Sequence, residues 1–283
     1  MPIVYLNGNY LPDTEAFIPV LDRGFIFGDG IYEVIPVYGG RLFRLDEHLE
    51  RLQNSLDGVR IRNPLSRAQW TGALQGLIDR NGGGDQSLYL QITRGVAKRD
   101  HAFPPDCEPT VFAMSNPLVP PAAEVLEKGV AAITIDDIRW QRCHIKAISL
   151  LPNILLRQAA LDQDAAEAIL IRDGLATEGA ASNLFAVLDG VLTTPAKGPL
   201  LLPGITRDLV LELAEAHGVP HREADIRRED LDSASEIWFT SSTREIVPAT
   251  RLNGQPVGDG KPGPVFRRMI TLYQDYKQAL RQG

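Results

Sequence analysis

The stretch that decides the fold is DRGFIFGDGIYEV, residues 22–34. It runs into an apolar segment, Ile31–Val37, whose residue types favour a β-strand. Gly39-Gly40 closes that strand, and the chain returns through Arg41–Phe43. Residues 4–11 predict a hairpin as well, because an Asn-Gly pair at their centre is the strongest two-residue turn signal. The chain therefore opens with short strands joined by tight turns.

Two helices are expected in the first half of the chain. Leucines recur at helical spacing around residues 46–56, which predicts an amphipathic helix. A second helix is predicted at Arg67–Arg80, where Asn81-Gly-Gly-Gly would end it. Alternating apolar and polar side chains predict a strand at residues 88–93, and Thr110–Met114 predicts a further one.

Clustered prolines at residues 117–121 predict a linker, because proline disfavours both a helix and a central strand. The domains are therefore expected at residues 1–116 and 122–283. In the second domain, strands are predicted near residues 130–138, 168–172, 184–188 and 236–240, and helices near residues 155–163, 207–217 and 265–280. This alternation predicts two α+β domains with a functional site between them.

The bulk composition excludes several classes of protein. A chain of 283 residues is long enough for two modest domains, and its net charge of −7 disfavours nucleic acid and anionic membranes as partners. Cys107 and Cys143 predict neither a metal finger nor a disulfide framework. The N-terminus does not look like a signal peptide, and no apolar stretch is long enough to span a bilayer. We therefore expect a cytoplasmic protein.

Lys146 differs from the other lysines of the chain. Its neighbours from Ile145 to Leu151 are mostly apolar, whereas the other lysines sit beside glycine, proline or polar residues. An apolar setting disfavours the charged form of the amine and frees it to form a Schiff base with an aldehyde. The alternative is a lysine that extends its head to water along an apolar surface, and the local context alone favours that alternative.

Two segments could bind a phosphate group. Gly204-Ile205-Thr206 precedes a predicted helix, and the free N–H groups of a helix N-terminus attract anions. Ser241-Ser242-Thr243 follows a predicted strand and offers hydroxyl and N–H groups. An ordinary helix cap and a polar turn are the alternatives. Neither GxxxxGK[ST] nor a GxGxxG after a strand is present, so nucleotide binding is disfavoured.

Three polar residues outside these segments are candidates for a small-molecule site. Arg99 and His101 are two residues apart in an extended loop, so their side chains would point the same way and could trap a carboxylate. A mobile surface loop is the alternative and is favoured on local context. Glu178 could pair with a protonated ring nitrogen, or it could be a surface acid in a turn.

Taken in order, these segments resemble the class-IV, or fold-type IV, pyridoxal-phosphate (PLP) aminotransferases over nearly the whole chain. The motifs that carry the resemblance are residues 22–34, Asp46–Leu52, Thr93-Arg94-Gly95, Asp137–Trp140, Arg142-Cys143 with Ile145-Lys146, Thr177-Glu178-Gly179 with Ser182-Asn183, and Gly204–Asp208. Each motif is moderately specific, and their joint order and spacing are strong evidence. The resemblance implies a two-domain α+β fold with the cofactor at the domain interface.

The resemblance also implies a role for each candidate residue. Lys146 would hold PLP and then transfer the α-proton of the substrate, and Glu178 would keep the pyridine nitrogen protonated, which makes the ring an electron sink. The remaining implied cofactor contacts are Arg51, Leu202, Ile205, Thr206 and Ser242. The implied contacts to the substrate carboxylate are Tyr32, Arg99 and His101. No metal is implied.

Within the family, the chain looks most like the D-amino acid transaminases. Branched-chain relatives carry Tyr-Glu-Gly-x-Arg where this chain has Tyr32-Glu33-Val34-Ile35-Pro36, and the Arg-x-His pair marks the D-amino acid branch. The implied reaction moves the amino group of a D-amino acid, such as D-alanine, to 2-oxoglutarate or pyruvate. A homodimer is implied too, because in this family the partner lends Arg99 and His101.

Several other functions remain open on the sequence. An aminodeoxychorismate lyase of the same fold would share the lysine and the acid but eliminate pyruvate. An (R)-amine or branched-chain aminotransferase would share the cofactor chemistry. A non-catalytic protein that binds small molecules is a further alternative. It would leave the lysine in its apolar setting, the acid and the two anion sites without a shared purpose.

Overall fold

The computed structural model describes residues 1–282, and within them the chain forms two compact units. Unit 1 consists of residues 1–119 and 145–150 together with the chain from Leu280 onward, and unit 2 consists of residues 120–144 and 151–279. The segment Ile145–Leu150 thus belongs to unit 1, although the order of the chain places it in the second half. The domain limits derived from the sequence, 1–116 and 122–283, stay a prediction.

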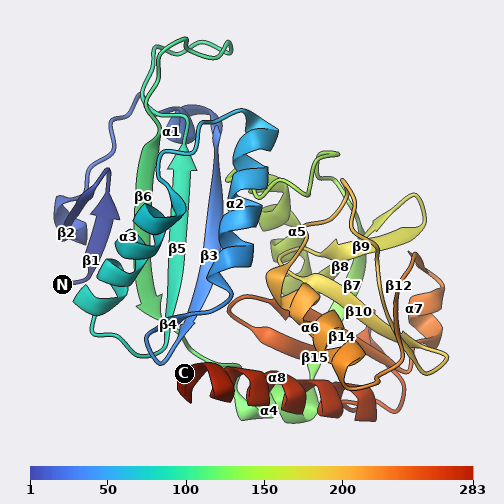
Figure 1. Cartoon of the computed structure of the whole chain (residues 1–283). Helices are drawn as coiled ribbons and strands as arrows, with labels where there is room; N and C mark the ends of the chain where they lie inside the picture. The colour runs from blue at the N-terminus through green and yellow to red at the C-terminus, as the bar shows by residue number, and fades with distance from the viewer. Residues whose placement is uncertain (283) are drawn as a thin grey trace. The chain divides into compact units, whose positions relative to one another are not determined.

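Unit 1 is built on one antiparallel sheet (Figure 1). Its strands are β1 (Ile3–Leu6), β2 (Asn9–Pro12), β3 (Gly30–Tyr38), β4 (Arg41–Leu42), β5 (Gln86–Thr93) and β6 (Thr110–Pro117). Its helices are the 3-10 helix η1 (Asp13–Glu15), α1 (Arg23–Phe27), α2 (Leu45–Val59) and α3 (Arg67–Arg80). The strand order is β2-β1-β6-β5-β3-β4, so β3 lies next to the short edge strand β4.

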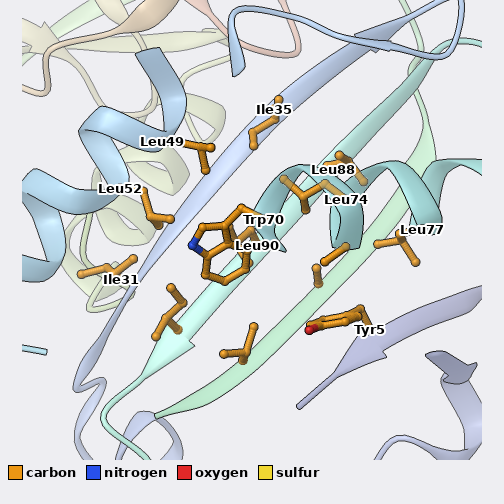
Figure 2. Packing of buried hydrophobic residues seen from close by; sticks show 14 of the residues in the cluster. Tyr5, Ile31, Ile35, Leu49, Leu52, Trp70, Leu74, Leu77, Leu88 and Leu90 are labelled. Carbon is orange, nitrogen blue, oxygen red and sulfur yellow. The ribbon is translucent and has the colours of Figure 1, made fainter. Parts of the chain in front are cut away.

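Helices α2 and α3 bury their apolar faces against this sheet. Figure 2 shows the cluster, in which residues of α2 and α3 meet residues of the strands: Leu49, Leu52, Trp70, Leu74 and Leu77 from the helices, and Tyr5, Ile31, Ile35, Leu88 and Leu90 from the strands. Trp70 is only 1% exposed. Burial of such side chains is the main stabilising contribution to the unit. Ser66 and Gln69 form a capping box that fixes the start of α3.

Unit 2 is built on a larger, mixed sheet (Figure 1). Its strands are β7 (Val130–Asp136), β8 (Glu167–Arg172), β9 (Leu175–Gly179), β10 (Asn183–Leu188), β11 (Val191–Thr194), β12 (His221–Glu223), β13 (Ile226–Arg227), β14 (Glu236–Ser241), β15 (Glu245–Leu252) and β16 (Gln255–Pro256). Its helices are α4 (Ala123–Lys128), α5 (Leu151–Leu161), α6 (Ile205–Ala216), α7 (Asp230–Ser233) and α8 (Pro264–Gln282), whose last residues, from Leu280, belong to unit 1. The order is β12-β11-β10-β14-β15-β7-β8-β9-β13, and β16 pairs with β15.

Most of the elements predicted from the sequence are present with shifted ends, and the α+β class is confirmed. The helix predicted from residue 155 begins earlier, at Leu151, because proline is tolerated in the first turn of a helix and Pro152 lies there. Strand β7 ends at Asp136, before the predicted end at Ile138. Within residues 1–282, none of the helices has both the length and the apolar character needed to cross a membrane.

Candidate active site

Lys146 lies on the segment of unit 1 that runs beside β3. The backbone N–H of Tyr32 donates to the Lys146 carbonyl over 2.9 Å. The backbone N–H of Lys146 donates to Ser55 Oγ on α2 over 3.1 Å. The preceding residue, Ile145, is 3% exposed and belongs to the core of unit 1. The backbone of Lys146 is therefore fixed on both of its edges.

The amine of Lys146 lies over an aromatic surface. Its Nζ is 4.1 Å from the centroid of the Tyr32 ring, and that ring stacks on Tyr89 with a centroid distance of 5.6 Å. The Tyr89 hydroxyl donates to Gln91 Oε1 over 2.7 Å. Burial raises the pKa of Tyr89 to about 12, with a further contribution from Tyr32. The structure thus brings two of the predicted residues, Lys146 and Tyr32, into contact.

Arg51 lies on α2 in a buried triad with His48 and with Glu33 of β3. Nε and Nη2 of Arg51 donate to the two Glu33 oxygens over 2.8 and 2.7 Å, and His48 Nδ1 lies 2.8 Å from Glu33 Oε2. Burial alone would raise the pKa of Glu33, but Arg51 and His48 lower it to about 2. Burial lowers the pKa of His48 against the opposing effect of Glu33, and the charges of Arg51 and Lys146 add to the lowering. Electrostatics therefore couple the triad to Lys146.

Arg99 and His101 lie on the exposed loop between β5 and β6. Both are next to Phe27 of α1: the Arg99 guanidinium carbon is 5.4 Å from the ring centroid, and the two ring centroids of His101 and Phe27 are 5.5 Å apart. Among the described residues, neither side chain makes a hydrogen bond or ring contact with Tyr32 or Lys146. Within residues 1–282, no direct contact therefore joins the predicted carboxylate trap to the predicted lysine.

Glu178 lies near the end of β9 in unit 2 and accepts hydrogen bonds from Arg139, Asn183 and Leu202. They come from Arg139 Nη1 at 2.5 Å, Asn183 Nδ2 at 3.2 Å and the Leu202 backbone N–H at 3.1 Å. Arg139 is held in turn by Asp137, whose two oxygens accept from Nε and Nη2 over 2.9 Å each. The carboxylate of Glu178 is thus held in one orientation by neighbours that are themselves fixed.

The partners of Glu178 form a buried chain of alternating charges. Burial alone would lower the pKa of Arg139, but the hydrogen bond to Asp137 and the charge of Glu178 raise it instead. Burial would raise the pKa of Asp137, but Arg139 and Arg172 lower it. Asp137 and Arg139 lie in the motif Asp137–Trp140, but the sequence predicts no role for them, because the contact of Arg139 with Glu178 joins distant parts of the chain.

The first turn of α6 has the features of an anion site. Thr206 is 2% exposed, and its buried hydroxyl has no hydrogen-bond partner within residues 1–282; the same is true of Thr240 at the end of β14. The helix begins without a side-chain cap at Gly204, where a Cβ would collide with the side chain of Asn183. Uncapped N–H groups and a buried hydroxyl without a partner suit a phosphate group.

The remaining predicted cofactor contacts lie close to these elements of unit 2. Leu202 contributes its backbone N–H to Glu178, and Ile205 is the first residue of α6. Ser242 is partly exposed in the turn after β14. Each unit by itself thus contains groups of a kind that can hold PLP: an amine in unit 1, and a fixed carboxylate and a helix end suited to an anion in unit 2. In residues 1–282 there is no group of three or more His, Cys, Asp or Glu residues that could hold a metal ion.

The fold and these groups define a PLP enzyme of fold type IV. The sequence profile described as amino-transferase class IV matches residues 30–252, and the chain belongs to this family. It is 42% identical to D-alanine aminotransferase of Bacillus licheniformis over 96% of each chain. It is 38% identical to D-alanine aminotransferase of Staphylococcus aureus (strain COL) over 98% of each chain.

Solved structures give the same family. The branched-chain amino acid aminotransferase of Escherichia coli superposes with a TM-score of 0.91 at 28% identity, covering 96% of this chain and 93% of that one. A hypothetical aminotransferase from Mycobacterium tuberculosis, in its PLP-bound form, gives a TM-score of 0.84 at 25% identity, covering 96% and 97%. The protein is therefore an aminotransferase whose cofactor is PLP.

Proposed function

We propose that this protein transfers the amino group of D-amino acids, D-alanine among them, to a 2-oxo acid such as 2-oxoglutarate. The observation that carries the chemistry is Lys146, whose backbone is fixed on both edges and whose amine lies over Tyr32. The D-amino acid substrate is supported by the 42% identity to a D-alanine aminotransferase, against 28% to a branched-chain enzyme. The Arg-x-His pair at Arg99 and His101 agrees with this choice.

The roles of the residues follow from their surroundings. Bound PLP supplies an electron sink that lets the substrate lose its α-proton. Lys146 would hold the cofactor covalently and would then move that proton, and Glu178 would keep the ring nitrogen protonated. The phosphate would be bound by Arg51, by the backbone N–H groups of Ile205 and Thr206, and by Ser242. Leu202 would act on the cofactor through Glu178, to which its backbone N–H donates.

The substrate carboxylate is bound by Tyr32 together with Arg99 and His101 of a second copy of the chain. In one chain the last two residues are exposed and, within residues 1–282, do not contact Tyr32 or Lys146. Unit 1 also exposes large apolar side chains that a partner would cover, since Phe17 is 78%, Val20 is 71% and Phe25 is 76% exposed. These two observations support a homodimer.

The cytoplasmic location expected from the sequence stays a prediction.

The proposal is tested with a panel of D- and L-amino acids, each offered with 2-oxoglutarate to the purified yellow holoenzyme. We expect 2-oxo acid formation from D-alanine and other D-amino acids, with much less from their L-enantiomers. Preference for L-leucine or L-valine would instead indicate a branched-chain aminotransferase. Release of pyruvate from 4-amino-4-deoxychorismate without an amino acceptor would indicate the lyase.

A further inference from the structure

The loop that carries Arg99 and His101 is exposed, but its backbone is held by a buried arginine. Arg23 of α1 is 4% exposed. Its Nη1 donates to the carbonyl of Asp100 over 2.6 Å and to the carbonyl of Ala102 over 3.4 Å. These two carbonyls lie directly before and after His101 in the chain. One guanidinium nitrogen thus fixes the backbone on both sides of that residue.

The side chain of Arg23 is itself held by an ion pair with Asp29. Its Nε donates to Asp29 Oδ2 over 2.8 Å, and the same oxygen accepts from Arg94 Nε over 2.8 Å. Arg94 also donates to the carbonyls of Val59 and Arg60 at the end of α2, over 2.8 and 3.0 Å. The loop carbonyls are therefore connected through Arg23, Asp29 and Arg94 to a helix of the core.

The two exposed side chains of the loop share one aromatic neighbour. Phe27, the last residue of α1, lies 5.4 Å from the Arg99 guanidinium carbon and has its ring centroid 5.5 Å from that of His101. The guanidinium carbon of Arg23 lies 4.8 Å from the same centroid. A guanidinium within about 6 Å of a ring centroid is attracted to it, so Phe27 restrains the direction of Arg99.

We propose that Arg23 and Phe27 are positioning residues that hold Arg99 and His101 ready for the substrate carboxylate. Arg23 fixes the backbone of the loop, and Phe27 fixes the directions of the two side chains. Ordering these groups before the substrate arrives reduces the entropy cost of binding it. This inference rests on the proposed function, which assigns the carboxylate to Arg99 and His101.

The test uses propionate, which has the carboxylate and methyl group of alanine but no amine to react. Its competitive inhibition constant against D-alanine is measured for the holoenzyme at constant ionic strength. The variants are Arg23→Gln and Phe27→Leu, with Arg99→Ala as the benchmark. Arg62→Gln is the matched control, because Arg62 is 69% exposed and pairs with the exposed Glu108.

We expect Arg23→Gln and Phe27→Leu each to raise the inhibition constant by about 10-fold, the effect of one charge-assisted hydrogen bond. Arg99→Ala should raise it at least as much, and Arg62→Gln should leave it unchanged. Adding Arg23→Gln to Arg99→Ala should have little further effect, since both act on one contact. Trypsin should cleave after Arg99 faster in Arg23→Gln than in the wild type, which reports loop release without any turnover.

The results separate the inference from the function on which it rests. If Arg99→Ala raises the inhibition constant but Arg23→Gln and Phe27→Leu do not, Arg23 and Phe27 do not position the loop and the inference is wrong. If Arg99→Ala itself has no effect, the carboxylate role fails, and the inference fails with it. Should Arg23→Gln not fold, Phe27→Leu alone decides between these results.

Discussion

Hydrogen bonds fix the backbone of Lys146, so only the methylene groups of its side chain separate the fixed backbone from the reactive amine. We expect borohydride reduction of the yellow holoenzyme, followed by peptide mapping, to place the pyridoxyl group on Lys146. Lys197 serves as the internal control, because its amine pairs with Asp208 over 2.7 Å and is half exposed. A label on any lysine other than Lys146 would contradict the assignment.

Glu178 sits beside a permanent positive charge, since Arg139 contacts one of its oxygens at 2.5 Å. In Glu178→Gln the neutral amide no longer keeps the ring nitrogen protonated. We expect the variant to bind the cofactor but to remove the substrate α-proton more slowly, on the order of 100-fold, as when one preorganised electrostatic contact is lost. Stopped-flow absorbance with D-alanine measures this step. Wild-type rates in the variant would refute the role.

Arg99 should matter only for substrates with a carboxylate. Truncating one partner of a desolvated ion pair costs roughly 2–5 kcal/mol, so Arg99→Ala should lose roughly 30- to 5,000-fold in kcat/KM for D-alanine. An (R)-amine without a carboxylate never makes this contact, and its turnover should be nearly unchanged. Equal losses with both substrates would point to misfolding or cofactor loss, and no loss with either would make the loop a plain surface loop.

At the level of secondary-structure elements, the triad of Glu33, His48 and Arg51 connects β3 to α2. Its titration makes the free energy of unfolding depend on pH. The pKa of Glu33 is lowered from 4.5 to about 2, so its contribution is complete above pH 4.5 and is lost as the pH falls toward 2. The loss should amount to about 3 kcal/mol of unfolding free energy. The lowered pKa of His48 acts in the same direction, because the unfolded chain takes up that proton first.

This pH dependence is measured as the urea midpoint at pH 4.5 and at successively lower pH. Glu33→Gln should be less stable at neutral pH, by roughly 3–5 kcal/mol, because Arg51 loses its buried partner. Its midpoint should also change less with acid than that of the wild type. Glu50→Gln, an exposed position of the same helix, should follow the wild type at every pH. Parallel curves for Glu33→Gln and the wild type would exclude Glu33 as the source.

The sequence predicted best those elements in which apolar residues recur regularly over many positions. Helix α3 was predicted at its observed bounds, because its buried residues recur every three or four positions and Asn81 with three glycines ends it. The sequence did not predict the eight-residue strand β15, nor the shorter elements η1, α1, α4, α7, β9, β11, β12, β13 and β16. The shorter elements have too few residues to show a recognisable period in the sequence, and their tertiary contacts determine whether they form.

The site was predictable to the extent that its residues are close in sequence. His48 and Arg51 are three apart on a helix, so their shared face was available from spacing alone. The buried contact of Arg139 with Glu178 joins residues 39 positions apart, and no local pattern indicates it. The same holds for Arg23 and the loop carbonyls of Asp100 and Ala102. The family resemblance marked these motifs without revealing what their side chains contact.

For the whole molecule, the proposed exchange of Arg99 between partners can be tested by complementation. Lys146→Ala and Arg99→Ala chains with different affinity tags are co-expressed, and the mixed dimer is isolated by sequential purification. One of its two sites then has Lys146 together with an intact Arg99 from the partner, so we expect about half of the wild-type activity with D-alanine. Each variant homodimer should be far less active.

If Arg99 instead served the site of its own chain, the mixed dimer would have no complete site and would be as inactive as the parents. A chain that runs as a monomer of 31.1 kDa in light scattering would also rule out the exchange. Dimers made from wild-type chains that carry the same two tags provide the reference activity.

The segment Ile145–Leu150 has a consequence for how this protein can be divided. It belongs to unit 1 although unit 2 residues precede and follow it in the chain. A gene fragment that encodes residues 1–119 therefore lacks Ile145, which fills part of that unit's core, and the Ala147 backbone that bridges to Ile31. Such a fragment would expose apolar surface where the missing segment packs. Each unit is compact, but neither is encoded by one continuous stretch of sequence, so a single cut in the chain does not separate them.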